Sequence, residues 1–357
     1  PVQNKPARVV SAPALDGTMD FALLAVTMLL VTFGVVMVYS ASAVFAGHLH
    51  HDAQYYLVRQ SIYAAVGFVG LAVAARTDYR TLRKYTYPLL ALTVLLLVAV
   101  VVGFGHAGGG AARWLKLGPI RVQPAEVAKV TLVMWLAHSL AKKNEKIRTF
   151  SVGFLPHLMI AGVLMALCLK QPDFGSAVVL LLLTFTLLFV AGARTGYILG
   201  AGILAMPVAW YLVTGTAYRR SRWEAFLDPW KHRHGISYQL VESMMSFGNG
   251  GVSGTGLGDS RQKLFFLPEA HTDFISAIVG EELGFLGMCG LILAYIFLLW
   301  RGVRIALRAA DDHGTYLAFG VTTLFGLQAL INLGVAMGVL PTKGLTLPFV
   351  SFGGSSL

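Results

Sequence analysis

Three carboxylates stand where long apolar stretches of the chain begin. Glu126 and Asp173 each follow a Gln-Pro pair by no more than two residues, and Asp273 follows the run 268–272. Ionisable side chains next to membrane-length apolar runs are costly and usually serve a function. Each acid could instead complement the dipole of its own helix. That simpler interpretation explains one acid better than it explains three.

Basic and small residues accompany the acids and indicate an anionic ligand. Lys129 lies one helical turn after Glu126, so the two could bind a ligand together or form an internal ion pair. Helix N-termini and glycine-rich backbone favour phosphate groups, and acids beside a phosphate often bind a divalent cation. The other basic, hydroxyl or glycine candidates are Arg113, Arg222, Lys263, Ser351, Gly353 and Gly354.

The elements that must position these residues are transmembrane helices. The chain has 357 residues, of which 56% are hydrophobic and 13% are charged, whereas a soluble domain carries about a quarter charged residues. A bilayer core needs about 20 apolar residues per helix. We therefore predict an all-α polytopic membrane protein with about ten transmembrane helices. Nine spans are expected near 21–45, 57–75, 87–105, 125–141, 153–169, 175–193, 196–214, 274–300 and 315–340, and a tenth begins near 350 and lies mostly beyond the given residues.

Basic residues in short connections orient the spans. Clusters at 76–84 and 142–148 belong inside, so residues 1–20 form a cytoplasmic tail and 21–357 form one transmembrane domain. Spans 4, 6 and 8 then begin at the outer face, with the three acids on one side. A long outer loop covers about 215–273, and helical spacing over 240–247 predicts an amphipathic helix on the membrane surface.

Span 8 carries two further acids and a row of small residues. Glu281 and Glu282 lie about two helical turns into it, so at least one must face the bundle interior. Ser276, Gly280 and Gly284 repeat every four residues and predict close helix packing.

Several other types of site are excluded by their context. Cys168 and Cys289 lie inside apolar runs, so neither a disulfide nor a metal site is expected. The histidine-rich run 48–52 has no second group at ligand spacing, which argues against structural zinc. No strand precedes the glycines of 248–258, so they are not a dinucleotide-binding fingerprint.

Longer motifs extend across the chain. They are Ala112-Arg113-Trp114-Leu115, Gln123-Pro124-Ala125-Glu126-Val127-Ala128-Lys129, Gln171-Pro172-Asp173-Phe174-Gly175, Leu227-Asp228-Pro229-Trp230, and the runs 254–263, 267–274, 280–284 and 347–356. Through these motifs the chain resembles the SEDS family (shape, elongation, division and sporulation). The Gly-Leu-Gly-x-Ser-x-Gln-Lys form at 256–263 is closer to the division branch than to the elongation branch.

The resemblance implies a peptidoglycan glycosyltransferase that polymerises lipid II at the outer face of the cytoplasmic (inner) membrane, at the division septum. The family's essential aspartate falls on Asp273, which would act as a base or hold a magnesium or manganese ion. Its other cavity residues fall on Glu126, Lys129 and Asp173. The run around Asp273 adds Glu269, His271 and Thr272 as substrate-binding candidates. Arg113, Lys129 and arginines of the long loop would hold the diphosphate.

The implied partners are a class B penicillin-binding transpeptidase of the FtsI type, the FtsQ, FtsL and FtsB division proteins, lipid II and membrane lipids, but no nucleic acid. A lipid II flippase and an elongation-type (RodA) paralogue are the alternatives, and a scaffold role could coexist with catalysis. Acids gathered at one face favour surface chemistry over transport, which would use charges near the membrane midplane. Ser276 stands where relatives often have Phe, and we interpret this as a packing change.

Overall fold

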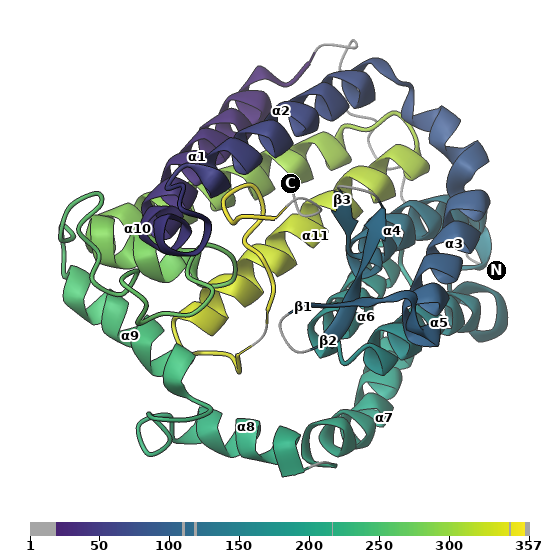
Figure 1. Cartoon of the computed structure of the whole chain (residues 1–357). Coiled ribbons are helices and arrows are strands. Elements are labelled where there is room, and N and C mark those ends of the chain that lie inside the picture. The colour runs from purple at the N-terminus through teal and green to yellow at the C-terminus, as the bar shows by residue number, and fades with distance from the viewer. Residues whose placement is uncertain (1–18, 109–110, 118–119, 216, 343, 354–357) are drawn as a thin grey trace.

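The computed structural model describes residues 19–353 apart from 109–110, 118–119, 216 and 343, and it consists almost entirely of helices (Figure 1). Each of the nine predicted spans corresponds to a helix. They are α1 (Phe21–His50), α2 (Tyr55–Arg76), α3 (Leu82–Ala99), α4 (Pro124–Lys142), α5 (Leu155–Lys170), α6 (Phe174–Val190), α7 (Thr195–Thr214), α10 (Ile275–Leu307) and α11 (Asp312–Ala336). Short helical turns cover Tyr79–Thr81, Val100–Phe104, Asn144–Lys146 and Phe150–Phe154. Most of the predicted tenth span lies outside the described residues.

Within the described residues, seven helices are long and apolar enough to cross a membrane by themselves. The spans 4 and 6 of the prediction, α4 and α6, fall outside that set: α6 has only 17 residues, and α4 carries an ion pair in its first turns. Both helices lie inside the bundle, where α4 contacts α3, α6 and α11. Protein rather than lipid therefore surrounds them, which relaxes the need for a long apolar surface.

The core of this inner part follows helical periodicity. Leu132, Leu136 and Leu140 of α4 are fully buried at four-residue spacing, and Leu180 and Leu187 of α6 are fully buried against them. Side chains at this spacing form one face of a helix. The buried face fixes α4 and α6 side by side and brings their N-termini to the same end of the bundle.

A small antiparallel sheet, which the sequence analysis did not predict, precedes α4. Its strands β1 (His106–Gly108), β2 (Ala111–Leu117) and β3 (Ile120–Val122) are ordered β1-β2-β3. Leu115 pairs with Val122 across β2 and β3, and Leu115 is buried whereas Lys116 is exposed. Alternation of this kind is the signature of a half-buried strand. The sheet holds Arg113 of β2 next to the start of α4.

The long connection between α7 and α10 contains α8 (Ala217–Leu227) and α9 (Tyr238–Gly250), which lie at the edge of the bundle in Figure 1. The amphipathic helix predicted over 240–247 is confirmed as α9. Its apolar face packs against protein, and the location of α9 at the membrane surface stays a prediction. Leu240 and Val241 are buried together with Ser243, whose hydroxyl donates to the Ala336 carbonyl at 2.7 Å. The face contains polar groups that need protein partners, so α9 packs on α10 and α11.

The cysteines and the histidine-rich run are placed as follows. Cys168 and Cys289 are both free thiols. The histidine-rich run 48–52 begins in the last turn of α1, which extends to His50, five residues further than predicted. The His50 ring stacks on Tyr55 with centroids 3.8 Å apart. Among the described residues no three potential metal ligands come together.

Candidate functional site

The acid at the start of α6 serves its own helix. Asp173 is the N-cap of α6: one carboxylate oxygen accepts from the Ser176 N–H at 3.1 Å and the other from the Ser176 hydroxyl at 2.7 Å. Gln123 donates a longer bond of 3.4 Å to the same carboxylate. Asp173 is 4% exposed. The simpler interpretation, a carboxylate that complements its helix, therefore holds for Asp173, and substrate contact by this side chain is not supported.

The acid at the start of α4 is partly open, but its basic neighbour is not. The Lys129 ammonium lies 2.6 Å from a carboxylate oxygen of Glu126, and the lysine is fully buried. The other carboxylate oxygen of Glu126 accepts from the Gln328 amide at 3.2 Å. The pair is the internal ion pair that the sequence left open. The Lys129 ammonium is therefore engaged by the chain itself and fully buried, and a diphosphate contact by this residue stays a prediction.

Arg113 joins three elements at this end of the bundle. Its Nε donates to the Gln171 carbonyl at 3.2 Å and one of its terminal nitrogens donates to the Pro172 carbonyl at 2.6 Å. These carbonyls belong to the turn between α5 and α6. The guanidinium is also close enough to Asp273 to lower the pKa of that carboxyl. A fixed cation thus faces the carboxylate that precedes α10.

Asp273 is the least constrained of the three acids. Phe274 is the N-cap of α10, so Asp273 lies one residue outside the helix and does not cap it. Its own backbone is held, because its N–H donates to the Glu269 carbonyl at 3.2 Å and its carbonyl accepts from the Asn332 amide at 2.9 Å. Its half-buried carboxylate has no hydrogen-bond or ion-pair partner within the described part of the chain. The side chain of Asp273 therefore does not cap α10.

The surroundings of Asp273 raise its pKa to about 7. Burial is the largest cause, the charge of Glu269 adds to it, and Arg113 opposes it. Gly344 contributes to the enclosure, since a Cβ at that position would lie only 2.8 Å from a carboxylate oxygen. A carboxyl with this pKa can both release and accept a proton near neutral pH, which is what a general base requires.

The run before Asp273 forms the wall of the site. Glu269 is exposed, has a positive φ of 55°, and accepts from the Thr272 hydroxyl at 2.9 Å. His271 is buried against the rings of Tyr56 and Phe352, and its burial lowers its pKa. Glu269 is exposed and Thr272 is half-buried, so both stay candidates for substrate contact, whereas His271 is packed among aromatic rings.

The C-terminal glycine motif lies deeper than expected. Ser351 is buried, and its hydroxyl accepts from the Leu347 N–H at 2.8 Å. The backbone of Phe349 approaches Gly34 of α1 so closely that a Cβ there would lie 2.5 Å from the Phe349 carbonyl oxygen. Ser351 therefore organises a buried turn, and its contact with substrate stays a prediction. Gly353 is buried as well, and Gly354 lies outside the described residues.

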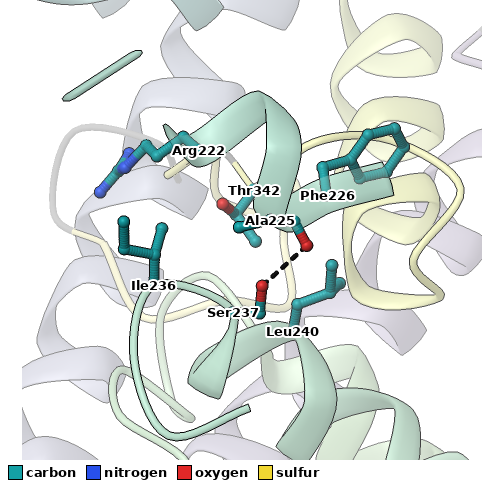
Figure 2. Close-up of a pocket in the computed structure, with 7 residues that line it drawn as sticks. All are labelled: Arg222, Ala225, Phe226, Ile236, Ser237, Leu240 and Thr342. Carbon is teal, nitrogen blue, oxygen red and sulfur yellow. Dashed lines mark hydrogen bonds between the residues drawn. The ribbon is translucent and has the colours of Figure 1, made fainter. Parts of the chain in front are cut away.

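Two predicted long-loop residues have other surroundings in the structure. Lys263 is buried in an ion pair with Glu282, 2.9 Å apart, so it is not a diphosphate ligand in this structure. Arg222 is an exposed residue of α8 beside a small cavity lined also by Ala225, Phe226, Ile236, Ser237, Leu240 and Thr342. Figure 2 shows its side chain pointing away from that cavity, which a Ser237 hydrogen bond to the Ala225 carbonyl at 2.7 Å closes on one side.

Three amide side chains of the site were missed by the sequence analysis. Gln123 contacts Asp173, Gln328 contacts Glu126, and Asn332 holds the backbone of Asp273 and the Leu345 carbonyl at 2.6 Å. The signal was present for two of them: Gln328 and Asn332 are four residues apart in an apolar span and so share one helix face. Polar side chains inside such a span need protein partners.

Together the fold and the site define a polytopic helical membrane protein with a polar site at one end of its bundle, built by the N-terminal ends of α4 and α6, strand β2 and the residues before α10. The sequence profile of the cell cycle protein family that unites FtsW, RodA and SpoVE matches residues 20–357. The chain belongs to this family, which is the SEDS family that its motifs indicated.

Individual relatives agree with that assignment. The chain is 48% identical over 339 residues to a protein of Geobacter metallireducens named probable peptidoglycan glycosyltransferase FtsW, covering 95% of this chain and 90% of that protein. It is 39% identical to the stage V sporulation protein E of Bacillus subtilis, covering 95% and 93% of the two chains.

Two solved structures share the architecture. One, described as showing structural coordination of polymerization and crosslinking by a peptidoglycan synthase complex, superposes with a TM-score of 0.79 at 30% identity, over 95% of this chain and 93% of that one. The rod shape determining protein RodA of Thermus thermophilus superposes with a TM-score of 0.69 at 29% identity, over 95% and 91%. The predicted fold class is therefore confirmed.

Proposed function

We propose that the chain is a peptidoglycan glycosyltransferase that polymerises lipid II at the membrane face carrying Asp273. The observation that carries the proposal is the carboxylate of Asp273, which has no partner among the described residues and a pKa of about 7 that the charge of Arg113 holds down. The names of the relatives at 48% and 47% identity, probable peptidoglycan glycosyltransferase FtsW, support the same reaction.

The reaction joins a sugar hydroxyl to an anomeric carbon that carries a lipid diphosphate. The acceptor 4-hydroxyl attacks the anomeric carbon, its proton passes to the carboxylate of Asp273, and the bond from carbon to the diphosphate oxygen breaks. The leaving diphosphate keeps the electron pair of that bond. Base assistance of this kind contributes about 10²–10⁴-fold to a rate, and the fixed positive charge of Arg113 stabilises the charge that develops on the leaving group.

A divalent cation belongs to the proposal as a ligand shared with substrate. No protein cage of three ligands forms among the described residues, but magnesium commonly uses one or two carboxylates together with substrate phosphates. The carboxylates of Asp273 and Glu269 fit that donor set. A cation bound there would neutralise charge on the departing diphosphate.

The proposed partner is a class B penicillin-binding transpeptidase of the FtsI type, with FtsQ, FtsL and FtsB as further division partners. The similarity to the chain solved in a peptidoglycan synthase complex supports the transpeptidase. The FtsW names of the relatives support a place in the cytoplasmic membrane at the septum.

The test is polymerisation of purified lipid II by the chain co-purified with its transpeptidase, with the transpeptidase blocked by a β-lactam. We expect glycan strands that a muramidase digests. A transporter would move labelled lipid II across vesicle membranes without forming polymer, and that outcome would replace the proposal with the flippase alternative.

A further inference from the structure

The helix α10, which follows Asp273, is interrupted at Gly284. The backbone there has φ 64° and ψ −163°, a conformation essentially restricted to glycine. An uninterrupted helix would have the N–H groups of Phe285 and Leu286 donate to the carbonyls of Glu281 and Glu282, four residues earlier. The break leaves these four backbone groups without their helical partners, and polar backbone groups inside a membrane-spanning helix need others.

The segment 251–256, directly after α9, supplies all four partners. The bonds are Phe285 N–H to Gly251 carbonyl at 2.9 Å, Leu286 N–H to Val252 carbonyl at 3.1 Å, Thr255 N–H to Glu281 carbonyl at 2.9 Å, and Gly256 N–H to Glu282 carbonyl at 3.0 Å. The segment therefore replaces the two missing helical hydrogen bonds with four of its own. Segment 251–256 is therefore hydrogen-bonded to α10 on both sides of the break, although most of its residues are exposed.

Glycines allow α9 and segment 251–256 to pack closely against α10. A Cβ on Gly250 would clash with the Gly280 carbonyl oxygen, and a Cβ on Gly254 would clash with that of Glu282. A Cβ on Gly284 would clash with the Gly254 nitrogen. The small-residue row of α10 thus does provide the close packing that the sequence predicted, but its neighbour at Gly280 and Gly284 is the chain's own α9 and segment 251–256.

The side chains of Glu281 and Glu282 secure the residues that follow. Glu281 accepts from the Ser260 hydroxyl, and from the N–H groups of Arg261 at 3.3 Å and Gln262 at 3.4 Å. Both glutamates are 1% exposed, so the prediction that at least one faces the interior is confirmed for both. Charged acceptors in such surroundings make the stronger class of hydrogen bond.

Glu282 ties the same segment to α1. Its carboxylate accepts from the Ser40 hydroxyl at 2.7 Å and lies 2.9 Å from the Lys263 ammonium. Breaking a buried pair by removing one partner leaves an uncompensated charge. The residues 251–263 are thereby held to α10 and to α1 at once.

Asp273 lies ten residues after segment 251–263 in the sequence. The Leu267 N–H donates to the Gln262 carbonyl at 2.9 Å, and the Asp273 N–H donates to the Glu269 carbonyl at 3.2 Å. The loop from 264 to 274 therefore begins at a segment fixed to Glu281 and Glu282 and ends at the first turn of the same helix. We infer that Glu281 and Glu282 are positioning residues, which set the place of the Asp273 carboxylate through segment 251–263; this rests on the proposed function.

The test compares Glu281→Gln and the double variant Lys263→Met/Glu282→Gln with a matched control, Asp20→Asn. The control breaks the ion pair between α10 and the N-cap residue of α1, Arg301–Asp20 at 2.6 Å, and Asn keeps the Asp20 helix cap. The double variant leaves no unpaired charge, so a loss of activity in it cannot come from a buried lone lysine. All proteins are purified with the transpeptidase partner.

Two readouts separate positioning from general stability. For both test variants we expect kcat for lipid II polymerisation to fall about 10- to 100-fold with KM changed less than about threefold, as for a misplaced catalytic group. Amide exchange over 251–263 should rise at least about tenfold, while exchange at the Arg301 end of α10 stays unchanged. The Asp20→Asn control should keep its kcat at an equal or larger loss of melting temperature.

A kcat in both test variants equal to that of the control would overturn the inference, and so would unchanged exchange over 251–263. If a test variant fails to fold, Ser40→Ala removes one neutral donor to Glu282 and is measured in the same way. Failure of the proposed function would be recognised separately, because the wild-type complex would then form no polymer, whereas amide exchange still reports whether the glutamates hold the segment.

Discussion

Replacing Asp273 by Asn separates a chemical role from a structural one. The carboxylate is half-buried, has no partner in the described part of the chain and does not cap α10, so the fold does not depend on its charge. Asn is nearly isosteric but cannot accept the acceptor proton. Polymerisation should therefore fall by at least about 100-fold, the lower end of the contribution of a general base.

The direction in which Asp273→Asn changes the stability of the fold can also be predicted. Burial raises the pKa of Asp273 from 3.8 to about 7, so between these pH values the folded chain binds a proton that the unfolded chain has released. Stability then falls as the pH rises from about 4 to about 7, and above that range the ionised carboxylate destabilises the fold. Asp273→Asn should melt at the same or a higher temperature than wild type at pH 8, and the difference should shrink towards pH 5.

The assay measures lipid II polymerisation and thermal unfolding on one sample of the purified complex, at pH 5 and pH 8. Near-normal polymerisation by Asp273→Asn would refute the assignment of the base. Loss of activity together with a lower melting temperature at pH 8 would refute the reasoning in another way, since it would make the carboxylate a structural group.

Three further substitutions test the surroundings of Asp273. Glu269→Gln removes a charge that raises the Asp273 pKa, so the rising limb of the pH profile of kcat/KM should move to lower pH; a limb that stays in place contradicts this. Arg113→Gln removes the charge that lowers the Asp273 pKa and two hydrogen bonds to carbonyls. The rising limb of the pH profile should therefore move to higher pH, and kcat should drop about 10- to 100-fold. Unchanged kinetics would argue against a role for Arg113. Gln328→Leu leaves one carboxylate oxygen of Glu126 without its amide partner and should lower the free energy of unfolding by about 1–3 kcal/mol. Thermal unfolding measures this loss, and Leu330→Ala, at an exposed position of α11, is the control.

Periodicity and span length located the helices because both report directly on burial in an apolar solvent. The nine predicted spans coincide with helices, and Asp273 was singled out from its position before one of them. The same rules could not show the break of α10 at Gly284, because a glycine in an apolar run is equally compatible with close helix packing and with a positive φ. They also could not show strand β2, whose pattern of alternation is only a few residues long.

The partners of buried charges were harder to predict than the charges themselves. Lys129 and Lys263 were expected to meet a phosphate, yet each lies against a glutamate of the chain itself, 2.6 Å and 2.9 Å away. A basic residue near a membrane surface has the same sequence signature in either case. Only the fold decides, since it brings Glu282 of α10 to Lys263 of the preceding loop.

The most direct test of a polymerase confined to one face uses proteoliposomes of known orientation. Tyr238→Cys at the start of α9, in a chain whose Cys168 and Cys289 are replaced by Ala, reports orientation through a thiol reagent that does not cross membranes. Lipid II is then supplied only to the leaflet that faces the Asp273 end of the bundle, or only to the opposite leaflet. We predict glycan strands from the first leaflet and none from the second; polymer from both leaflets, or labelled lipid II crossing the membrane without polymer, would contradict the account.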